Sequence, residues 1–227
     1  MSETKTPPPS KQAAKRQATE RRILKAFERL LKRKGSNQLG INALVEEAEV
    51  GKGLIYEYFG GLEGVAKAWG AQSDFALSEE DILGGEREAF LEKSTARQIA
   101  DVHVNYANML RRSPVALQLL AEELNTPDKL SKHFSAIRGQ IGSTHEKVFT
   151  EIAPLADEDD MALCFIFLAA SNYLALRATT SPNYNGIELN TDEGWNSVMS
   201  MFQRIANKVD QPSSDKPLPG SKQVVAP

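Results

Sequence analysis

Apolar residues recur every three or four positions along most of this 227-residue chain. That spacing places them on one face of an α-helix, whereas a half-buried strand would alternate apolar and polar residues. The stripes are clearest in residues 95–112, 127–152 and 191–209, and no segment alternates over a useful length. The pattern predicts an all-α fold, and the length allows one or two domains with a buried core.

The two ends of the chain differ in composition from the rest. Residues 1–18 contain the run Pro7-Pro8-Pro9 and almost no large apolar side chain, and residues 210–227 are rich in Pro, Ser and Lys. Such segments bury too little apolar surface to offset the entropy of ordering. We therefore predict a disordered basic arm over 1–18, a small helical domain over 19–70, a larger helical domain over 71–209 and a disordered tail over 210–227.

Residues 41–59 predict two short helices joined by a tight turn. Leu44 and Ala48 recur at helical spacing on the first helix, and Leu54 and Ile55 continue the core on the second. A short helix with an apolar back and a polar, aromatic front is suited to lying in a DNA groove. The front of the second helix carries Lys52, Gly53, Tyr56 and Tyr58.

The net charge of −3 conceals an uneven distribution. Residues 1–34 carry 11 basic and 3 acidic side chains, a balance of +8, whereas residues 35–60 carry 1 and 4, a balance of −3. The positive charge therefore lies in the arm and the first helix, and not in the helix pair. A basic segment either follows a nucleic-acid backbone or is a solvated terminus, and charge alone does not decide between the two.

Cysteine usage and hydropathy point to the cell interior. The single cysteine, Cys164, excludes an intramolecular disulfide and suits a reducing compartment. The N-terminus lacks the apolar segment of a secretory signal. The longest apolar run, residues 161–170, is shorter than the roughly 20 residues that span a bilayer. We expect a cytoplasmic protein that has no membrane segment.

Catalytic and metal-binding chemistry find little support in the sequence. Neither the nucleophile-elbow pattern GxSxG nor the phosphate-binding pattern GxxxxGK[ST] occurs. His133 and His145 lie 12 residues apart on one predicted helix and cannot share a metal ion unaided, and three or four convergent zinc ligands are not evident. Cys164, within an apolar helix, is typical of an inert buried residue. We therefore expect no enzymatic activity, no cofactor and no metal site.

Over roughly residues 19–70 the chain resembles the tetracycline-repressor (TetR) family of bacterial regulators. The resemblance rests on the helix Arg22–Phe27, on Gly35, Ile41, Leu44, Ala48 and Val50, and above all on Lys52-Gly53-Leu54-Ile55-Tyr56-Glu57-Tyr58-Phe59 followed by Gly60 and Glu63. It implies a homodimer with an N-terminal three-helix helix-turn-helix domain and a C-terminal helical ligand-binding and dimerisation domain. It also implies a repressor that a small molecule releases from a palindromic DNA operator.

The resemblance assigns DNA contacts to individual residues. Lys52 would meet a phosphate or a base edge, and Gly53 would let the backbone approach the major groove. The two tyrosines would place hydroxyls on phosphates, although capping a small core is the alternative for them. Amides at the start of the next helix would bind a phosphate, and the arm would follow the backbone or enter the minor groove. The predicted DNA-binding set is Lys52, Gly53, Leu54, Tyr56, Tyr58, Gly61, Leu62, Arg21 and Arg22.

Some positions depart from the family pattern. Leu39-Gly40 and Gly51 stand where the family has Thr or Ser at helix starts, and Leu62 stands where it has lysine. Glu49 occupies a turn position where a left-handed backbone favours glycine, at a cost of about 1 kcal/mol. The alternative interpretation is therefore a helical dimer of the same family that no longer reads DNA and binds a small molecule or a partner.

Two helices near the C-terminus suit a dimer interface. Residues 161–176 are apolar almost all round, so their helix needs cover on several sides, and residues 191–209 carry a clean apolar stripe. Two such helices from each of two subunits form a four-helix bundle. We predict a homodimer through residues 157–177 and 191–209, with a helix buried inside a monomer as the alternative.

A ligand cavity is expected among four predicted helices of the larger domain, over residues 95–112, 113–124, 127–152 and 157–177. Apolar walls with a few polar groups suit a hydrophobic or aromatic small molecule. The candidates lie on the inward stripes of the predicted helices, and each has plain core packing as its alternative. The candidate lining residues are His103, Tyr106, Met109, Leu120, Phe134, Ile137, Phe165 and Tyr173.

Overall fold

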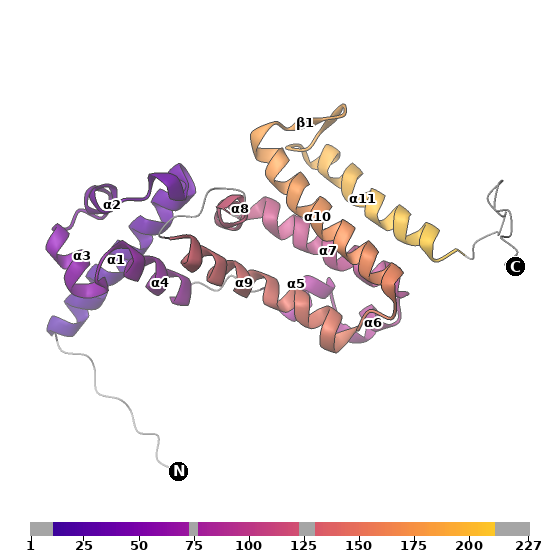
Figure 1. Cartoon of the computed structure of the whole chain (residues 1–227), viewed down its shortest axis with the longest axis horizontal. Coiled ribbons are helices and arrows are strands. Elements are labelled where there is room, and N and C mark those ends of the chain that lie inside the picture. Colours follow the sequence, from indigo (N-terminus) through magenta and orange to yellow (C-terminus); the bar gives the residue numbers. More distant parts are fainter. Residues whose placement is uncertain (1–10, 73–76, 123–129, 212–227) are drawn as a thin grey trace, which may run out of the picture.

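The computed structural model describes residues 11–72, 77–122 and 130–211, and most of them lie in helices. Figure 1 shows helices α1–α4 gathered at one end of an elongated molecule and helices α7, α10 and α11 at the other. The predicted all-α fold, with a small N-terminal and a larger C-terminal helical domain, is confirmed. The tail over 212–227 and the first ten residues of the predicted arm lie outside the described residues.

The N-terminal domain consists of one long helix crossed by three short ones. The elements are α1 (Lys11–Lys34), a 3₁₀ turn η1 (Ser36–Gln38), α2 (Ile41–Ala48), α3 (Lys52–Phe59) and α4 (Leu62–Gln72). Ile23, Phe27 and Ile55 are 0% exposed at the centre of this domain. The ring of Phe27 packs against that of Trp69 with their centroids 5.4 Å apart. Burial of these side chains fixes the three short helices against α1.

Helix α1 is longer than the sequence predicts. It begins at Lys11 and not near Thr19, so residues 11–18 are helical and this part of the predicted disordered arm is wrong. The Arg16 guanidinium donates to Glu20 at 2.8 Å and lies over the Tyr58 ring, 4.7 Å from its centroid. An ion pair one turn apart and a cation–π contact both favour the helix. The basic end of α1 is therefore held beside α3.

The turn between α2 and α3 has the backbone that the sequence predicts. Glu49 adopts φ 51° and ψ 48°, in the left-handed region. Arg22 donates a hydrogen bond to the Glu49 carbonyl at 3.4 Å, which ties the turn to α1. Val50 follows the turn and is 8% exposed, so the chain enters α3 from the core.

Helix α7 lies at the centre of the C-terminal domain and packs against both α10 and α11. The elements are α5 (Glu79–Leu83), α6 (Arg87–Leu91), α7 (Thr95–Arg112), α8 (Pro114–Glu122), α9 (Ser131–Lys147) with a π-helical turn η2 (Val148–Ile152), α10 (Glu158–Thr180) and α11 (Asp192–Val209). Ser113 caps α8 by accepting from the Ala116 N–H at 3.2 Å, as its Ser-Pro sequence predicts. Asp157 caps α10 in the same way.

A two-stranded hairpin between α10 and α11 is the exception to the helical pattern in the described part of the chain. Strands β1 (Asn183–Tyr184) and β2 (Ile187–Glu188) pair antiparallel. Asn185 and Gly186 have φ of 51° and 82°, which is the left-handed pair of a type I′ turn. Each strand is too short for an alternation of apolar and polar residues to be detected in the sequence. The Asn-Gly dipeptide is itself a hairpin signal, which our sequence analysis missed.

The two domains meet where α4 packs against α9 and α1 packs against α8. The helices pack tightly at Gly70, where an added Cβ would lie 2.5 Å from Cγ1 of Ile137. Glycine therefore permits α4 and α9 to come this close. Ile137 is 4% exposed at this junction between the domains, so it belongs to core packing rather than to a cavity wall.

Candidate functional site

The outward face of α3 carries the residues that the sequence predicts. Ile55 is fully buried on the inner side, whereas Lys52 and Gly53 are exposed and Tyr56 is 51% exposed. A Cβ built on Gly53 meets nothing within 4 Å, so the backbone there is open to an approaching molecule. The structure thus presents a lysine, a bare backbone and a tyrosine on one rigid helix.

Tyr58 and Leu54 lie on the side of α3 that faces α1. Both are half-buried, and together with Lys15 and Arg16 they line a shallow surface cavity between the two helices. Arg16 covers the Tyr58 ring. Tyr58 is therefore less free to reach out from the surface than Tyr56, whereas the cations of α1 lie directly beside α3.

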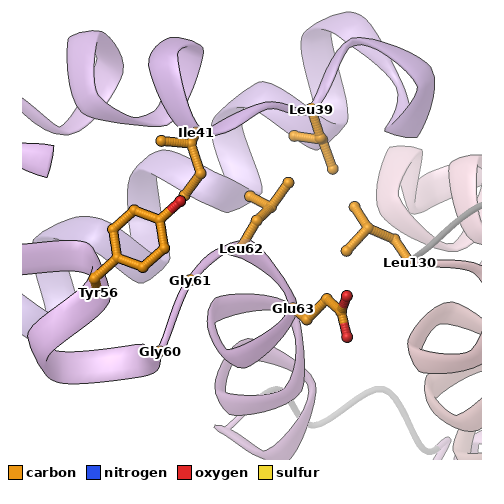
Figure 2. Close-up of a pocket in the computed structure, with 8 residues that line it drawn as sticks. All are labelled: Leu39, Ile41, Tyr56, Gly60, Gly61, Leu62, Glu63 and Leu130. Carbon is orange, nitrogen blue, oxygen red and sulfur yellow. The ribbon is translucent and has the colours of Figure 1, made fainter.

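Tyr56 borders a second groove, which Figure 2 shows. Its ring extends across Gly61 toward Ile41, and a Cβ added to Gly61 would lie 3.5 Å from that ring. Leu62 points into the groove between Ile41 and Leu39, and Leu130 closes the far side. The groove has a volume of about 670 Å³. At this end of α4 the lysine typical of the family is replaced by an apolar side chain packed among apolar neighbours.

Arginines of α1 divide into paired and accessible groups. Arg29 and Arg33 both bind Glu47, at 2.7 and 2.6 Å, and their hydrogen bonds hold the pKa of that carboxyl below its usual value. Arg21 is exposed, and Arg22 is exposed while donating to the turn carbonyl. Positive charge available to an anionic partner is therefore concentrated toward the N-terminal half of α1.

The C-terminal domain contains a cavity of about 340 Å³ bordered by α7, α9 and α10. Arg138 donates to the Tyr106 hydroxyl at 3.1 Å, and that hydroxyl donates to Asn172 at 3.1 Å. The lining residues are Tyr106, Ser135, Arg138, Gly139, Gly142, His145 and Leu168. This wall is more polar than the sequence predicts, since Arg138, Ser135 and His145 were not among the candidates.

The structure separates the eight predicted ligand-binding residues. Tyr106 lines the cavity and His103 lies behind it, in contact with His145. Met109 borders a different surface cavity, next to Asn105. The others are placed elsewhere: Leu120, Phe134 and Ile137 are core residues no more than 4% exposed, and Phe165 and Tyr173 are 73% and 51% exposed. The prediction for Phe165 and Tyr173 is corrected, because both lie on a face of α10 that points outward and not toward α7.

A cluster of three potential metal ligands, which our sequence analysis missed, lies behind the cavity. Nε2 of His103 is 3.0 Å from Nε2 of His145 and 3.9 Å from Sγ of Cys164. Burial lowers the pKa of His103 to about 3, aided by nearby His145, and burial raises the pKa of Cys164 to about 11. The expectation that no ligand set converges is wrong, because it considered residues on one helix and not the meeting of three helices.

Apolar side chains gather on the outer face of α10 and α11. Met161, Phe165 and Ile166 are 53%, 73% and 60% exposed on α10, and Ile205 and Val209 are 44% and 56% exposed on α11. Among the described helices, α10 alone has the length and composition to cross a membrane, with a third of its most apolar window buried. The apolar run considered in the sequence is only part of this 23-residue helix.

A buried three-helix framework that presents α3, joined to a separate helical domain, defines a helix-turn-helix protein. Residues 23–68 match the model of the bacterial regulatory proteins of the tetR family. The predicted resemblance is therefore confirmed, and the N-terminal domain is of the TetR type. No curated protein sequence matches the chain.

Two solved structures have a similar fold. One is a TetR-family transcriptional regulator from Haemophilus influenzae, at 23% identity and a TM-score of 0.50, covering 84% of this chain and 97% of that one. The other is NalD, the secondary repressor of a multidrug efflux pump in Pseudomonas aeruginosa, at 15% identity and a TM-score of 0.50, covering 86% and 96%. At such identities the likeness shows the shared architecture across both domains.

Proposed function

We propose that this protein is a homodimeric, ligand-responsive DNA-binding regulator that acts as a repressor in the cytoplasm and not as an enzyme. The observation that carries the proposal is the outward face of α3, where Lys52, Gly53 and Tyr56 are exposed while Ile55 is anchored in the core. The cations at the start of α1 lie beside that face. Base reading by α3 would supply specificity, and phosphate contacts by α1 would supply affinity.

A dimer follows from the exposed apolar face of α10 and α11. Several large, exposed apolar side chains grouped on two helices are unusual on a monomer and typical of an interface. A two-fold axis through it would pair two α3 helices, and such readers bind half-sites about 34–36 Å apart. The same face accounts for the membrane-like composition of α10 without a bilayer, since a partner helix covers apolar side chains equally well.

The effector would occupy the cavity beside Tyr106. Leu168 offers apolar contact, whereas the Arg138 guanidinium and the Tyr106 hydroxyl offer hydrogen bonds. This combination suits a hydrophobic or aromatic molecule that also carries an anionic or hydrogen-bond-accepting group. Anilinonaphthalene sulfonate has both parts, and Arg138→Ala should weaken its binding. An Arg204→Ala variant on exposed α11 serves as the matched control.

Fluorescence anisotropy with DNA from the gene's own upstream region tests the DNA proposal. We expect binding that survives an excess of unrelated competitor DNA at moderate salt. Lys52→Ala should weaken it and reduce the salt slope by about 1, whereas Lys67→Ala, exposed on α4, should change neither. Binding that disappears with salt and ignores sequence would contradict the proposal.

Deletion of residues 1–10 together with Lys11→Gln and Lys15→Gln tests the basic end of the chain. The structure shows that removing residues 1–18 would also remove two turns of α1, so the shorter deletion isolates charge from folding. The salt dependence should flatten by about 0.9 for each DNA phosphate that the variant no longer neutralises. An unchanged slope would show that residues 1–10, Lys11 and Lys15 make no phosphate contacts.

The second candidate function is a dimer that binds a small molecule or a partner without reading DNA. Glu49 in the turn and Leu62 at the groove favour it, because one adds a negative charge and the other lacks the expected lysine. Leu62→Lys separates the two: a domain that docks like its relatives should bind DNA more tightly with this change. No gain, together with no specific binding by the parent protein, would favour the second function.

A further inference from the structure

His103, His145 and Cys164 bring their ligand atoms together from three different helices. Their nearest side-chain nitrogen and sulfur atoms all lie within 4.8 Å of one another, where α7, α9 and α10 meet. His103 is 0% exposed, and Cys164 is 9% exposed. The proposed reading of DNA uses none of these groups.

Hydrogen bonding fixes the orientation of the central histidine. The His103 Nδ1–H donates to the Ile99 carbonyl at 2.6 Å, one helical turn earlier. The other nitrogen, Nε2, is then the one with a lone pair, and it points toward both His145 and Cys164. A backbone carbonyl behind a histidine is the usual way in which proteins orient a metal-binding imidazole.

The spacing fits a small tetrahedral ion. Ligands at about 2.0 Å for nitrogen and 2.3 Å for sulfur would stand roughly 3.3–3.6 Å from one another around zinc. The two measured separations from His103 Nε2, 3.0 Å to nitrogen and 3.9 Å to sulfur, lie on either side of that range. The three ligand atoms span 4.8 Å, so His145 and Cys164 must move toward each other by up to about 1.3 Å to complete the geometry.

We propose that His103, His145 and Cys164 form a binding site for a divalent transition-metal ion of the zinc class, with a water from the adjoining cavity as the fourth ligand. Two imidazoles and a thiolate are a borderline-soft set that selects such ions over magnesium or calcium. His145 lines the cavity as well as the cluster, so an ion has a path to the site. The site would tie α9 to α7 and α10.

Binding must release a proton for each ion. The thiol of Cys164 gives up its proton as the metal–sulfur bond forms, and the ion retains its +2 charge with no change of oxidation state. His145 must offer Nε2 as a lone pair, so its ring proton moves to Nδ1. Proton release in an unbuffered titration is therefore a readout of the site that does not depend on DNA or on an effector.

Titration of the full-length, chelator-treated protein with Co²⁺ tests the proposal. We expect one ion per chain, intense thiolate-to-cobalt charge-transfer absorption, d–d bands typical of tetrahedral coordination, and displacement of Co²⁺ by Zn²⁺. Cys164→Ser should abolish the charge-transfer absorption and weaken Zn²⁺ binding roughly tenfold or more, because even the loss of an outer partner costs that much. His145→Gln should also weaken Zn²⁺ binding.

His133→Gln is the matched control, since His133 lies on the same helix α9 but faces Glu63 at 3.7 Å instead of the cluster. It should leave the cobalt spectrum and stoichiometry unchanged. The two cluster variants are nearly isosteric, and circular dichroism checks that they fold. Absence of charge-transfer absorption in the parent protein would overturn the proposal, as would metal binding that Cys164→Ser leaves intact or that His133→Gln removes.

Discussion

The outward face of α3 and the cluster behind the cavity bring their side chains together in opposite ways. On α3, three exposed groups come from within five consecutive residues, Lys52–Tyr56, and one helix orients all of them. In the cluster, residues 103, 145 and 164 are brought together by α7, α9 and α10. The first arrangement can be inferred from a short stretch of sequence because helix geometry is local. The second requires the packing of helices that lie far apart in the chain.

The two regions also differ in their relation to solvent. The α3 face lies open beside the cations of α1, where a large anionic partner can reach it. The cluster lies in a buried site, where desolvation lowers the pKa of His103, which stays neutral, and raises the pKa of Cys164, whose thiol stays protonated. Surface groups can therefore be altered with little effect on stability, whereas the buried groups couple ligand chemistry to folding.

The largest expected effect is on DNA binding through the distant C-terminal domain. Phe165→Glu puts a charge in the centre of the apolar face of α10, where the side chain is 73% exposed in the single chain. It should yield monomers and lower operator affinity about 100-fold, because two linked reading helices gain avidity that one lacks. Light scattering and anisotropy measure both properties.

The matched control is Leu91→Glu on α6, where an apolar side chain is 46% exposed on a helix outside the proposed interface. It should remain dimeric and bind DNA normally. If Phe165→Glu also remains dimeric, the interface lies elsewhere. The comparison between α3 and the C-terminal domain would then apply to another surface of that domain.

Acid should destabilise the metal-free protein through the buried cluster. Because burial lowers the pKa of His103 from 6.5 to about 3, the folded state keeps this group neutral while the unfolded chain takes up a proton. Stability is thus complete above pH 6.5 and falls toward pH 3, by about 1.4 kcal/mol per pH unit for one histidine. Among the described titratable neighbours, burial also lowers the pKa of His145 and raises the pKa of Cys164.

Urea unfolding at pH 6.5 and 4.5, with chelator present, should show a loss of about 2–3 kcal/mol from this source. His103→Phe should remove much of the dependence, even if its stability at neutral pH is lower. An equally steep loss in that variant would place the titrating group outside the cluster. The comparison of the two proteins shows whether the buried cluster or other groups cause the loss of stability at low pH.

Gly53→Ala should change stability and DNA binding in opposite directions. The position is on α3 with open space around the added methyl group, so helix propensity should raise the free energy of unfolding by about 0.5–1 kcal/mol. The same methyl group should keep the backbone away from DNA and weaken operator binding roughly tenfold, an effect on the scale of one mismatched base pair. Urea unfolding would measure the gain in the free energy of unfolding, and anisotropy would measure the loss of DNA affinity. Unchanged DNA binding would mean that this backbone does not approach the groove.

Glu49→Gly should give the smallest effect. Glycine removes the cost of a left-handed backbone at φ 51°, although it loosens the unfolded chain, so we expect a gain of at most about 1 kcal/mol. Glu46→Gly, three residues earlier within α2, should instead destabilise by about that amount. If both variants lower the free energy of unfolding, strain in the turn is negligible.

Sequence reasoning succeeded where the signal was carried by neighbouring residues. The end of α1 at Gly35, the Ser113 cap and the left-handed turn at Glu49 depend on interactions over a few positions. It failed at Phe165 and Tyr173, because an almost uniformly apolar helix does not reveal which side faces the core. It also failed at the start of α1, where an ion pair and a ring contact extend the helix beyond its apolar stripe.

The sequence by itself determined the helices, the TetR-type motif and the residues on the outward face of α3, because helical periodicity and turn chemistry act over short distances. Only the tertiary structure decided that Arg138 borders a cavity, that α10 shows Phe165 to the outside, and that His103, His145 and Cys164 meet. The physical reason is that burial and proximity between distant segments depend on how helices pack in three dimensions, and one-dimensional spacing does not encode which faces meet.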